Sequence, residues 1–337
     1  MTNICIVGEA WGEHEERERT PFVGYSGHEL TKMLSEAGIA RADCHLTNVF
    51  NLRPKGNDIT TLCGTKPNGI SGYPPLAKSK YVSASYVPEL ERLATELCEV
   101  NPNVIIALGN TACWALLGRT GIGAIRGTTQ LSTRTVSGFK VLPTFHPAAV
   151  GRDWPLRPIV IVDFMKAKRE SEYAELRRPR REIWIQPTIN DIERFADEYI
   201  SKCKILSVDI ETAGNQITCI GFAPRNDLAL VVPFLDTRRL GRNYWETKEL
   251  EFRVWTIVRT ILECPEPAKL FQNGLYDISF LLRAQGIRVM GAMHDTMLLH
   301  HALQPEMKKG LGFLGSVYCD EGAWKSMREV ETIKRDD

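Results

Sequence analysis

Short apolar runs alternate with amphipathic stretches through the first half of the chain. The sequence predicts buried strands of a parallel sheet at residues 4–7, 46–50, 104–108 and 140–144. It predicts helices between them at residues 26–37, 87–100 and 109–117. Such alternation favours a parallel sheet covered by helices on both faces. The stretch 57–84, rich in Gly, Pro, Ser and Lys, predicts a long loop.

The pattern changes near Ile183, where a second unit begins. Three apolar runs close in sequence predict a three-stranded meander at residues 205–208, 217–223 and 228–234. A short strand is expected at 269–272. Helices are expected at residues 250–262, 275–285, 295–303 and 311–317. The chain therefore combines two α/β units of different strand order.

Length and composition agree with two ordinary globular domains. The chain has 337 residues, of which 43% are apolar and 25% charged. No apolar run approaches the roughly 18 residues that span a bilayer. The N-terminus does not have the pattern of a signal peptide, so a cytosolic protein with no membrane partner is expected. The nine cysteines form no C-x-x-C pair, which argues against a disulfide framework or a zinc ribbon.

Net charge is +1 and indicates no particular partner. The cations are concentrated instead in the segment 166–181, KAKRESEYAELRRPRR. Such a cluster can contact a phosphate backbone. A solvated basic linker, at residues 166–182, is the simpler interpretation, and the two are compatible.

The stretch from Gly8 to Gly27, GEAWGEHEERERTPFVGYSG, follows the first apolar run. Gly8 and Gly12 allow a tight turn and close approach to a ligand. The loop then carries an aromatic residue, Phe22, ahead of a helix start. This order is typical of a ligand site at the carboxyl edge of a sheet. The alternative is an ordinary strand-to-helix loop with solvated acids.

Three blocks together carry a resemblance to a known family. They are Gly8–Gly12 with Pro21–Gly24, then Thr47–Pro54 (TNVFNLRP), and His146–Ala148 within FHPAA. In this order they resemble the motifs of the uracil-DNA glycosylase superfamily, in particular the branch that often carries an iron–sulfur cluster. The resemblance covers residues 1–165. It implies a three-layer domain with a parallel sheet and a pocket for one extruded base.

The resemblance assigns roles to matching residues. Phe22 is expected to stack on uracil, Asn48 to read its edge, and His146 to hydrogen-bond the O2 oxygen. Glu9 and the Gly8 backbone are expected to line the pocket and position water. Ser26 and Arg53 are expected to contact DNA.

The chain also departs from the family pattern. Trp11 replaces the usual proline, and the loop after His146 runs into Gly151 without the bulky leucine that family members wedge into the duplex. The cluster cysteines that precede the first motif in the family are absent, and with Cys63 and Cys98 alone no iron–sulfur cluster is expected.

A carboxylate constellation is expected in the second unit. Asp209 and Glu211 are two apart on a predicted strand, so they share one face. Asn273 and Asp277 are four apart on a predicted helix and share a face as well. Converging carboxylates favour a hard cation, Mg²⁺ or Mn²⁺, held by Asp209, Glu211 and Asp277.

The order VDIET, QNGLYD and HDTML resembles the DEDD-type 3′–5′ exonucleases, as found in phage and bacterial family A DNA polymerases. This resemblance covers residues 183–337 and implies a ribonuclease H-like domain. Asn273 is expected to contact DNA. Asp295 is read as structural, and the family's third motif, a Tyr or His with a later Asp, does not follow, so we expect a domain truncated before that motif.

These observations predict an α/β phage-type protein for DNA replication and repair. It would excise uracil from DNA and carry a proofreading-type 3′–5′ exonuclease domain, as the N-terminal part of a family A DNA polymerase in a phage-infected bacterial cell. DNA with uracil or single-stranded 3′ ends is the expected partner, with a polymerase domain or other replication proteins. Two alternatives remain: a module that binds uracil-containing DNA without cutting it, and an interaction scaffold with two inactive sites.

Overall fold

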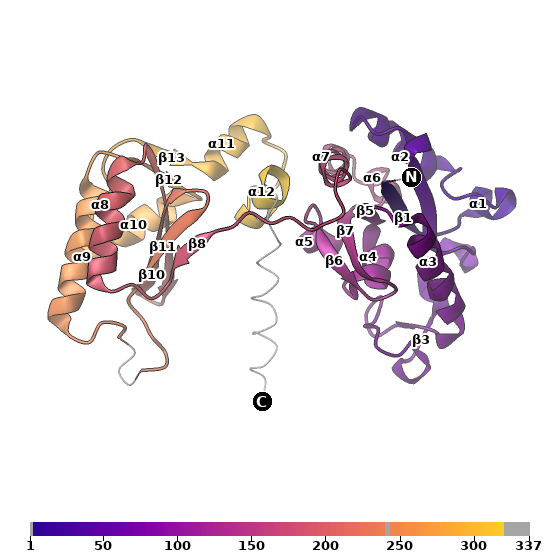
Figure 1. Cartoon of the computed structure of the whole chain (residues 1–337), viewed down its shortest axis with the longest axis horizontal. Helices are drawn as coiled ribbons and strands as arrows, with labels where there is room; N and C mark the ends of the chain where they lie inside the picture. The colour runs from indigo at the N-terminus through magenta and orange to yellow at the C-terminus, as the bar shows by residue number, and fades with distance from the viewer. Residues whose placement is uncertain (1–2, 240–242, 320–337) are drawn as a thin grey trace. The chain divides into compact units, whose positions relative to one another are not determined.

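The computed structural model describes residues 3–239 and 243–319 (Figure 1). The chain clusters into two compact units, one of residues 3–178 with 312–319 and one of residues 179–311. Residues 320–337 of the expected second domain lie outside the described residues. No helix in the described ranges is long and apolar enough to cross a membrane.

The first unit is a three-layer α/β domain. Its strands are β1 (Ile4–Ala10), β2 (Cys44–Phe50), β3 (Cys63–Gly64), β4 (Tyr81–Val82), β5 (Val104–Leu108), β6 (Gln130–Thr133) and β7 (Ser137–Thr144). Its helices are α1 (Glu13–Glu18), α2 (Tyr25–Glu36), α3 (Val87–Val100), α4 (Gly109–Leu117), α5 (Ile122–Ile125), α6 (Pro147–Val150) and α7 (Leu156–Glu170), with α12 (Leu311–Tyr318) added from Gly312 onward.

The main sheet of this unit has the order β2-β1-β5-β7-β6 within the described residues. β1, β2, β5 and β7 are parallel, and β6 is an antiparallel edge strand. The order reverses between β1 and β5, since the chain moves from β1 to β2 on one side and later to β5 on the other. Ligands bind open α/β sheets at the carboxyl ends of strands flanking such a reversal.

The two faces of the sheet are covered by different helices. Ile4 and Ile6 of β1 point into an apolar cluster with α2 and α7, whereas Cys5 and Val7 point into a second cluster with α3 and α4. The alternation follows from the two-residue period of a strand. Figure 1 shows α2 and α7 on one side of these strands and α3 and α4 on the other. The predicted parallel sheet with helices on both faces is confirmed.

The expected long loop at residues 57–84 contains more structure than predicted. Short 3₁₀ turns and the antiparallel pair β3–β4 organise it. Leu62, Leu76 and Val82 join the apolar cluster on the α3 and α4 side. The Trp114 indole N–H donates to the Pro74 carbonyl oxygen at 2.8 Å, which ties the segment to α4. Apolar residues spaced irregularly along the loop gave no periodic signal for this packing.

The expected basic linker begins inside a helix instead. α7 extends to Glu170, and Lys166 is buried. Its ammonium donates to the carbonyl oxygens of Gly127 at 3.2 Å, Ser316 at 2.7 Å and Cys319 at 2.6 Å. Residues 166–170 are thus part of the first unit, because backbone carbonyls satisfy the cation that suggested a solvated segment.

The second unit has a mixed sheet with the order β13-β12-β9-β10-β11-β8 in the described part of the chain. Its strands are β8 (Glu182–Trp184), β9 (Ile205–Ala213), β10 (Gln216–Arg225), β11 (Leu228–Pro233), β12 (Ala268–Phe271) and β13 (Met293–Asp295). Its helices are α8 (Ile189–Glu198), α9 (Lys248–Glu263), α10 (Gly274–Gln285) and α11 (Thr296–Leu303).

The predicted meander is confirmed as β9, β10 and β11, which are antiparallel. β12 joins β9 in parallel, and β13 joins β12 in parallel. One apolar cluster forms the core between this sheet and its helices, with Phe195 of α8, Val258 of α9 and Leu281 of α10. The arrangement agrees with the ribonuclease H-like fold class expected from the sequence.

A buried ion pair joins elements of the first unit. The Arg126 guanidinium donates to both oxygens of Asp163, with Nε to Oδ2 at 2.9 Å, and both side chains are almost fully buried. Thr144 donates to the same Asp163 oxygen at 2.6 Å. Arg126 also donates to the Ser316 hydroxyl at 2.8 Å, so this pair links β7, α7 and α12.

Replacement of one partner leaves the other charge buried and unpaired. We expect Asp163→Ala to lower the free energy of unfolding by about 3–5 kcal/mol. The double change Asp163→Leu with Arg126→Met should lose less, because no buried charge remains. Urea unfolding followed by tryptophan fluorescence measures both. A double variant as unstable as the single one would contradict this account.

Candidate functional site: a base-sized pocket and a carboxylate cluster

A pocket of about 540 Å³ opens at the carboxyl edge of the first sheet, where its strand order reverses. The ends of β1 and β5, the β2 residue Asn48 and the segment after β7 form its walls. The sequence-predicted residues Glu9, Phe22, Ser26, Asn48 and His146 all line it. Residues far apart in the chain are therefore brought together as the motifs indicate.

Phe22 is buried in the pocket wall with a left-handed backbone, φ 56°. Its loop is held from one side by Arg41, which donates to the carbonyl oxygens of Phe22 at 3.0 Å and Pro21 at 3.3 Å. The Phe22 ring lies 6.2 Å from the His146 ring, centroid to centroid, and the two planes are inclined at 31°. The aromatic face and the imidazole therefore border the same space.

Glu15 connects the two loops that shape the pocket. One carboxylate oxygen accepts the Gly12 backbone N–H at 3.1 Å, and the other accepts the Gly24 backbone N–H at 2.8 Å. The residue is only 9% exposed. From the sequence alone, the glutamates of this loop could equally have been solvated acids. Glu15 is instead a buried acceptor, because it lies on the inner face of α1.

Asn48 lies near the end of β2 and is 2% exposed. In the described ranges, no residue exchanges a hydrogen bond with its carboxamide, which is therefore available to a ligand edge. Gly8 pairs with Asn48 across the parallel strands. A Cβ at Gly8 would lie 2.2 Å from Asn48 Oδ1 and 2.5 Å from Phe22 Cζ. Only glycine allows this close approach.

His146 presents a defined hydrogen-bond donor. Its Nδ1 accepts the Ala148 backbone N–H at 3.1 Å, so the proton of the neutral ring resides on Nε2. Burial lowers the pKa of His146 to about 4, with the nearby Arg152 charge acting in the same direction and Glu15 opposing it. The ring is thus neutral at pH 7 and offers an Nε2–H to an acceptor.

Glu9 follows Gly8 at the pocket floor. Burial raises the pKa of its carboxyl group, and the hydrogen bond that Thr111 donates to its Oε2 opposes the rise. Trp11, the departure from the family pattern, also lines the pocket. Its indole N–H is buried without a partner in the described residues.

The expected DNA contact of Arg53 stays a prediction. Arg53 does not line the pocket. Its guanidinium pairs with Glu13 at 3.3 Å and Glu16 at 3.6 Å and donates to Asn57 Oδ1 at 2.8 Å. The acids of α1 therefore partly neutralise this cation.

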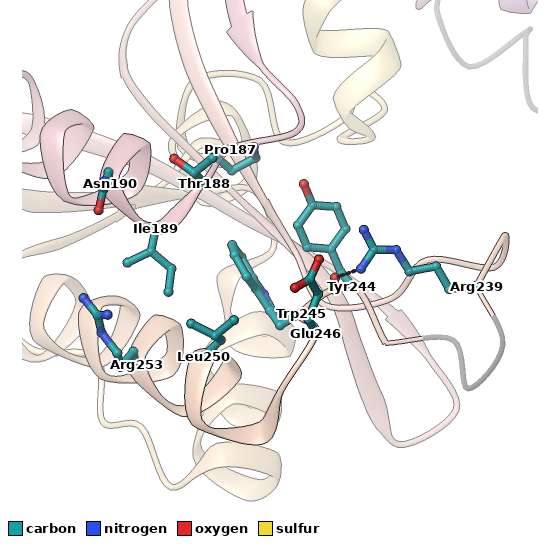
Figure 2. Close-up of a pocket in the computed structure, with 10 residues that line it drawn as sticks. All are labelled: Pro187, Thr188, Ile189, Asn190, Arg239, Tyr244, Trp245, Glu246, Leu250 and Arg253. Atoms are coloured by element: carbon teal, nitrogen blue, oxygen red, sulfur yellow. Dashed lines mark hydrogen bonds between the residues drawn. The ribbon is translucent and has the colours of Figure 1, made fainter.

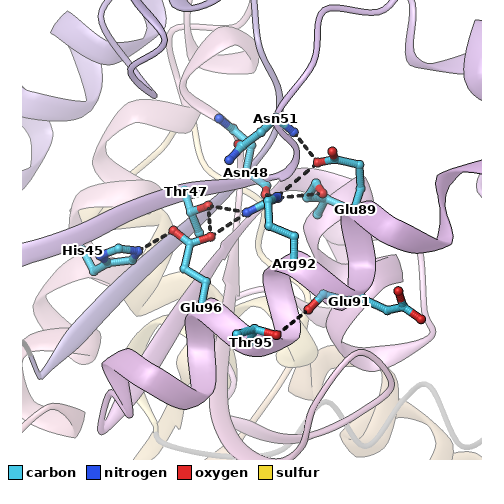
Figure 3. Close-up of polar contacts among 10 residues, drawn as sticks. His45, Thr47, Asn48, Asn51, Glu89, Glu91, Arg92, Thr95 and Glu96 are labelled. Atoms are coloured by element: carbon cyan, nitrogen blue, oxygen red, sulfur yellow. Dashed lines mark hydrogen bonds and ion pairs between the residues drawn. The ribbon is translucent and has the colours of Figure 1, made fainter.

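Arg92 was missed by sequence reasoning, because it lies on the polar face of α3 without a motif. It donates to the backbone carbonyl oxygens of Asn48 at 2.7 Å and Val49 at 3.2 Å (Figure 3). Glu96 accepts from the Arg92 guanidinium at 2.5 Å, from Thr47 at 2.9 Å and lies 2.6 Å from His45 Nε2. Arg92 therefore fixes the strand end that carries Asn48.

The second unit brings its expected carboxylates to one region. Asp209 and Glu211 alternate with buried residues along β9 and so share a face. Asp277 of α10 accepts the Ile210 backbone N–H at 3.1 Å. Burial raises the pKa of Asp277 to about 6, the Ile210 N–H opposes the rise, and the charges of Asp209 and Asp295 add to it. α10 thus packs over β9 as the spacing predicted.

Asn273 and Asp295 form the helix starts of this region. Asn273 precedes α10 in a left-handed conformation, φ 60°. Asp295 accepts the backbone N–H groups of Asn273 at 3.1 Å and Gly274 at 2.7 Å, as well as those of Met297 and Leu298 at the start of α11. These contacts agree with a structural Asp295. The expected helix at 295–303 begins one residue later, with Asp295 as its cap.

The residues for a metal are partly assembled. Carboxylate oxygens are the donors that Mg²⁺ prefers, and Asp277 and Asp209 already interact electrostatically. No three His, Cys, Asp or Glu side chains among residues 3–239 and 243–319 converge as a ligand set. The carboxylates suit a hard cation in kind, although their positions do not form a complete site. Nor do three cysteines lie together in the part of the chain that the structure describes.

A separate hollow of about 400 Å³ lies in the second unit (Figure 2). The Trp245 indole N–H is buried there without a partner in the part of the chain that the structure describes. Asp209, Glu211 and Asp277 do not line it, so it is distinct from the carboxylate region. Its lining is Pro187, Thr188, Ile189, Asn190, Arg239, Tyr244, Trp245, Glu246, Leu250 and Arg253.

The first unit thus defines an α/β domain with a pocket for a small planar polar ligand. The sequence profile of the uracil DNA glycosylase superfamily matches residues 1–171, and that of a 3′–5′ exonuclease family matches residues 187–331. The chain belongs to the uracil DNA glycosylase superfamily. Its second half is a 3′–5′ exonuclease domain, so the chain joins two hydrolase domains.

Known proteins resemble one half or most of the chain. The type-4 uracil-DNA glycosylase of Thermotoga maritima is 34% identical over 171 residues, which are 50% of this chain and 77% of that protein. The DNA polymerase of Bacillus phage SP01 is 21% identical over 329 residues, 88% of this chain and 32% of the polymerase. The crystal structure of Escherichia coli RNase D, at 15% identity and a TM-score of 0.32, covers 42% of this chain and 34% of that one.

The titration of His146 tests the neutral donor. We expect an NMR midpoint of about 4, below the ordinary value of 6.5. Removal of the neighbouring charge by Arg152→Gln should raise the midpoint without restoring 6.5, because burial remains the larger cause. Since only the unfolded chain gains this proton between pH 6.5 and 4, the contribution of His146 to the free energy of unfolding should fall as the pH is lowered through that window and stay constant above it. A midpoint near 6.5 would contradict the neutral, buried ring.

The role of Arg92 in positioning Asn48 can be tested by mutation. We expect Arg92→Ala to lower the free energy of unfolding by about 1–3 kcal/mol, because carbonyl oxygens and carboxylates lose their donor. The side-chain amide signal of Asn48 should shift in NMR spectra. The matched control, Arg53→Ala, removes an exposed ion pair and should change stability by less than about 1 kcal/mol. An unshifted Asn48 signal in Arg92→Ala would refute the positioning role.

Proposed function

We propose that the first domain excises uracil from DNA by hydrolysis of the N-glycosidic bond. One observation carries the proposal: Phe22, Asn48 and His146, from three separate segments, line one pocket of about 540 Å³. A base turned out of the duplex would stack on Phe22 and offer its polar edge to the free Asn48 carboxamide. A volume of about 540 Å³ lies within the range of small-molecule sites, so the pocket can admit a base.

His146 would supply the largest catalytic contribution. As the bond from the sugar C1′ to the uracil N1 breaks, the electron pair leaves with the base, and negative charge grows on O2. The Nε2–H of a neutral imidazole can donate to that oxygen in the water-poor pocket. Water then adds to C1′, and the proton that it loses neutralises the departed uracil anion. Glu9, whose carboxyl lies at the floor, would position this water.

The second domain would remove nucleotides from 3′ ends of DNA. Asp209, Glu211 and Asp277 are the proposed ligands of Mg²⁺ or Mn²⁺, which would activate water and stabilise the leaving oxygen. The support is the shared face of Asp209 and Glu211 with Asp277 packed above it. Asn273, at the α10 start beside this face, is proposed to contact DNA.

The similarity to a phage DNA polymerase supports a role in replication. This chain spans about a third of that polymerase and aligns over both of its own domains. We propose that it represents the N-terminal part of a family A DNA polymerase in a phage-infected bacterial cell. Removal of template uracil and of misincorporated 3′ nucleotides would then reside in one chain.

End-labelled DNA with a single uracil separates the two activities. In EDTA we expect alkali-labile cleavage at the uracil, and His146→Ala should reduce it by about 10²–10³-fold. His28→Ala, an exposed histidine of α2, is the matched control. With Mg²⁺ added, a ladder from the 3′ end should appear that Asp277→Asn removes and Asp227→Asn, on a surface turn, does not.

The two arms have independent outcomes. DNA bound at the uracil without cleavage in EDTA would favour a binding module over a glycosylase. No ladder with Mg²⁺ or Mn²⁺ would refute the exonuclease proposal for this chain. A ladder that persists in Asp277→Asn would show that other residues hold the metal.

A further inference from the structure

Three exposed side chains belong to the two segments that border the base-sized pocket. Tyr25 is 68% exposed and Trp154, two residues after Arg152, is 61% exposed. Tyr25 directly precedes the pocket residue Ser26, and Arg152 lines the pocket itself. We call Tyr25, Arg152 and Trp154 the pocket rim.

The two segments of the rim touch at Gly151. A Cβ built there would lie 3.2 Å from Tyr25 Cε1 and 3.5 Å from the Tyr25 hydroxyl oxygen. The Tyr25 ring therefore rests against the turn that follows His146. A side chain at Gly151 would require the ring to shift by a few tenths of an ångström. Gly151 thus leaves room for an aromatic ring from the first residue of α2.

Arg152 differs from the neighbouring arginines because its guanidinium has no acidic partner in the part of the chain that the structure describes. The Arg152 guanidinium forms no hydrogen bond or ion pair with another residue in the described ranges, whereas its backbone N–H donates to the Ala149 carbonyl oxygen at 3.1 Å. Arg53 is paired with Glu13 and Glu16. Arg157, whose guanidinium lies 5.2 Å from the Trp154 ring, is bound to Glu29 at 2.7 Å and Glu36 at 2.6 Å. Arg152 is thus a guanidinium at the pocket mouth that is available to a ligand.

An exposed aromatic ring and a guanidinium are suited to bind the DNA strand next to a flipped nucleotide. When a base leaves the stack, the next base loses a stacking partner. An exposed aromatic ring can replace that partner, whatever the sequence. A guanidinium binds the adjacent phosphate through two parallel hydrogen bonds.

We propose that Tyr25 stacks on the base next to the flipped nucleotide and that Arg152 binds the phosphate beside it. Trp154 supplies a second aromatic face on the same turn. The inference rests on the proposed base excision, because it assigns what holds the DNA while the pocket holds the base. Arg152, which lines the pocket, would thus add a phosphate contact to the one expected of Arg53.

The test is binding of the full chain to a fluorescein-labelled duplex that contains a tetrahydrofuran abasic analogue, in EDTA. We expect Tyr25→Ala to weaken binding about tenfold, because one stacking contact is lost. Tyr25→Phe should bind like the unsubstituted chain. Arg152→Gln should reduce the slope of log affinity against log salt by about 0.9, the value for one phosphate contact. Arg152→Lys should retain the slope.

Matched controls separate the rim from general effects of charge and exposure. Phe252→Ala removes an exposed aromatic residue of the second unit, and Arg134→Gln removes an exposed arginine of the β6–β7 turn. Neither should change affinity or salt slope. Weakening by Phe252→Ala equal to that by Tyr25→Ala would overturn the assignment.

The outcomes also separate this inference from the proposed excision. If Tyr25→Ala and Arg152→Gln bind like the unsubstituted chain, the rim assignment is wrong, even where uracil is excised. If the unsubstituted chain excises no uracil but the two variants lose affinity as expected, the rim assignment stands and the excision proposal fails. Absence of any binding by the unsubstituted chain overturns both.

Discussion

The pocket depends on one buried carboxylate. Glu15 accepts the N–H groups of Gly12 and Gly24 on its two oxygens, and so joins the loop after β1 to the loop that carries Phe22. Hydrogen bonds to an ionised acceptor are shorter and stronger than neutral ones. Without Glu15, two partly buried donors would lose their partner and the loops could separate. The stacking surface and the floor of the pocket are therefore set by the same side chain.

Arg41 and Arg92 hold two pocket segments through their backbone carbonyl oxygens. Arg41 holds the carbonyl oxygens of the Phe22 loop, as Arg92 holds those at the end of β2. Backbone that lies outside regular structure needs such partners when it is buried. The residues that would contact a base are thus placed by charged groups that do not face it. This division leaves the pocket wall neutral at His146 and Asn48.

Much of this architecture was predictable because its signals are local. The buried strand at residues 104–108 and the helices at 87–100 and 109–117 match the structure residue for residue. The site motifs also converge, since consecutive parallel strands end at one edge of a sheet. α8 was missed although Thr188 and Asp191 form a capping box and Ile189, Ile192 and Phe195 form an apolar stripe. Its signal was present in the sequence and was not used.

Other features could not be read from local pattern. Lys166 suggested solvent, yet three carbonyl oxygens contributed by distant segments bury it. Glu15 and Arg92 are ordinary polar residues of helices until the tertiary structure brings backbone groups to them. The pairing of Arg53 with α1 likewise depends on how two loops meet. Polar residues with long-range partners therefore define the limit of this sequence reading.

After the second unit, the chain returns to the first unit at Gly312. α12 thus packs with the first unit although the exonuclease profile extends to residue 331. A fragment that ends at Arg178 would lack the α12 groups that receive hydrogen bonds from Arg126 and Lys166. A fragment meant to keep these buried cations paired therefore has to include α12.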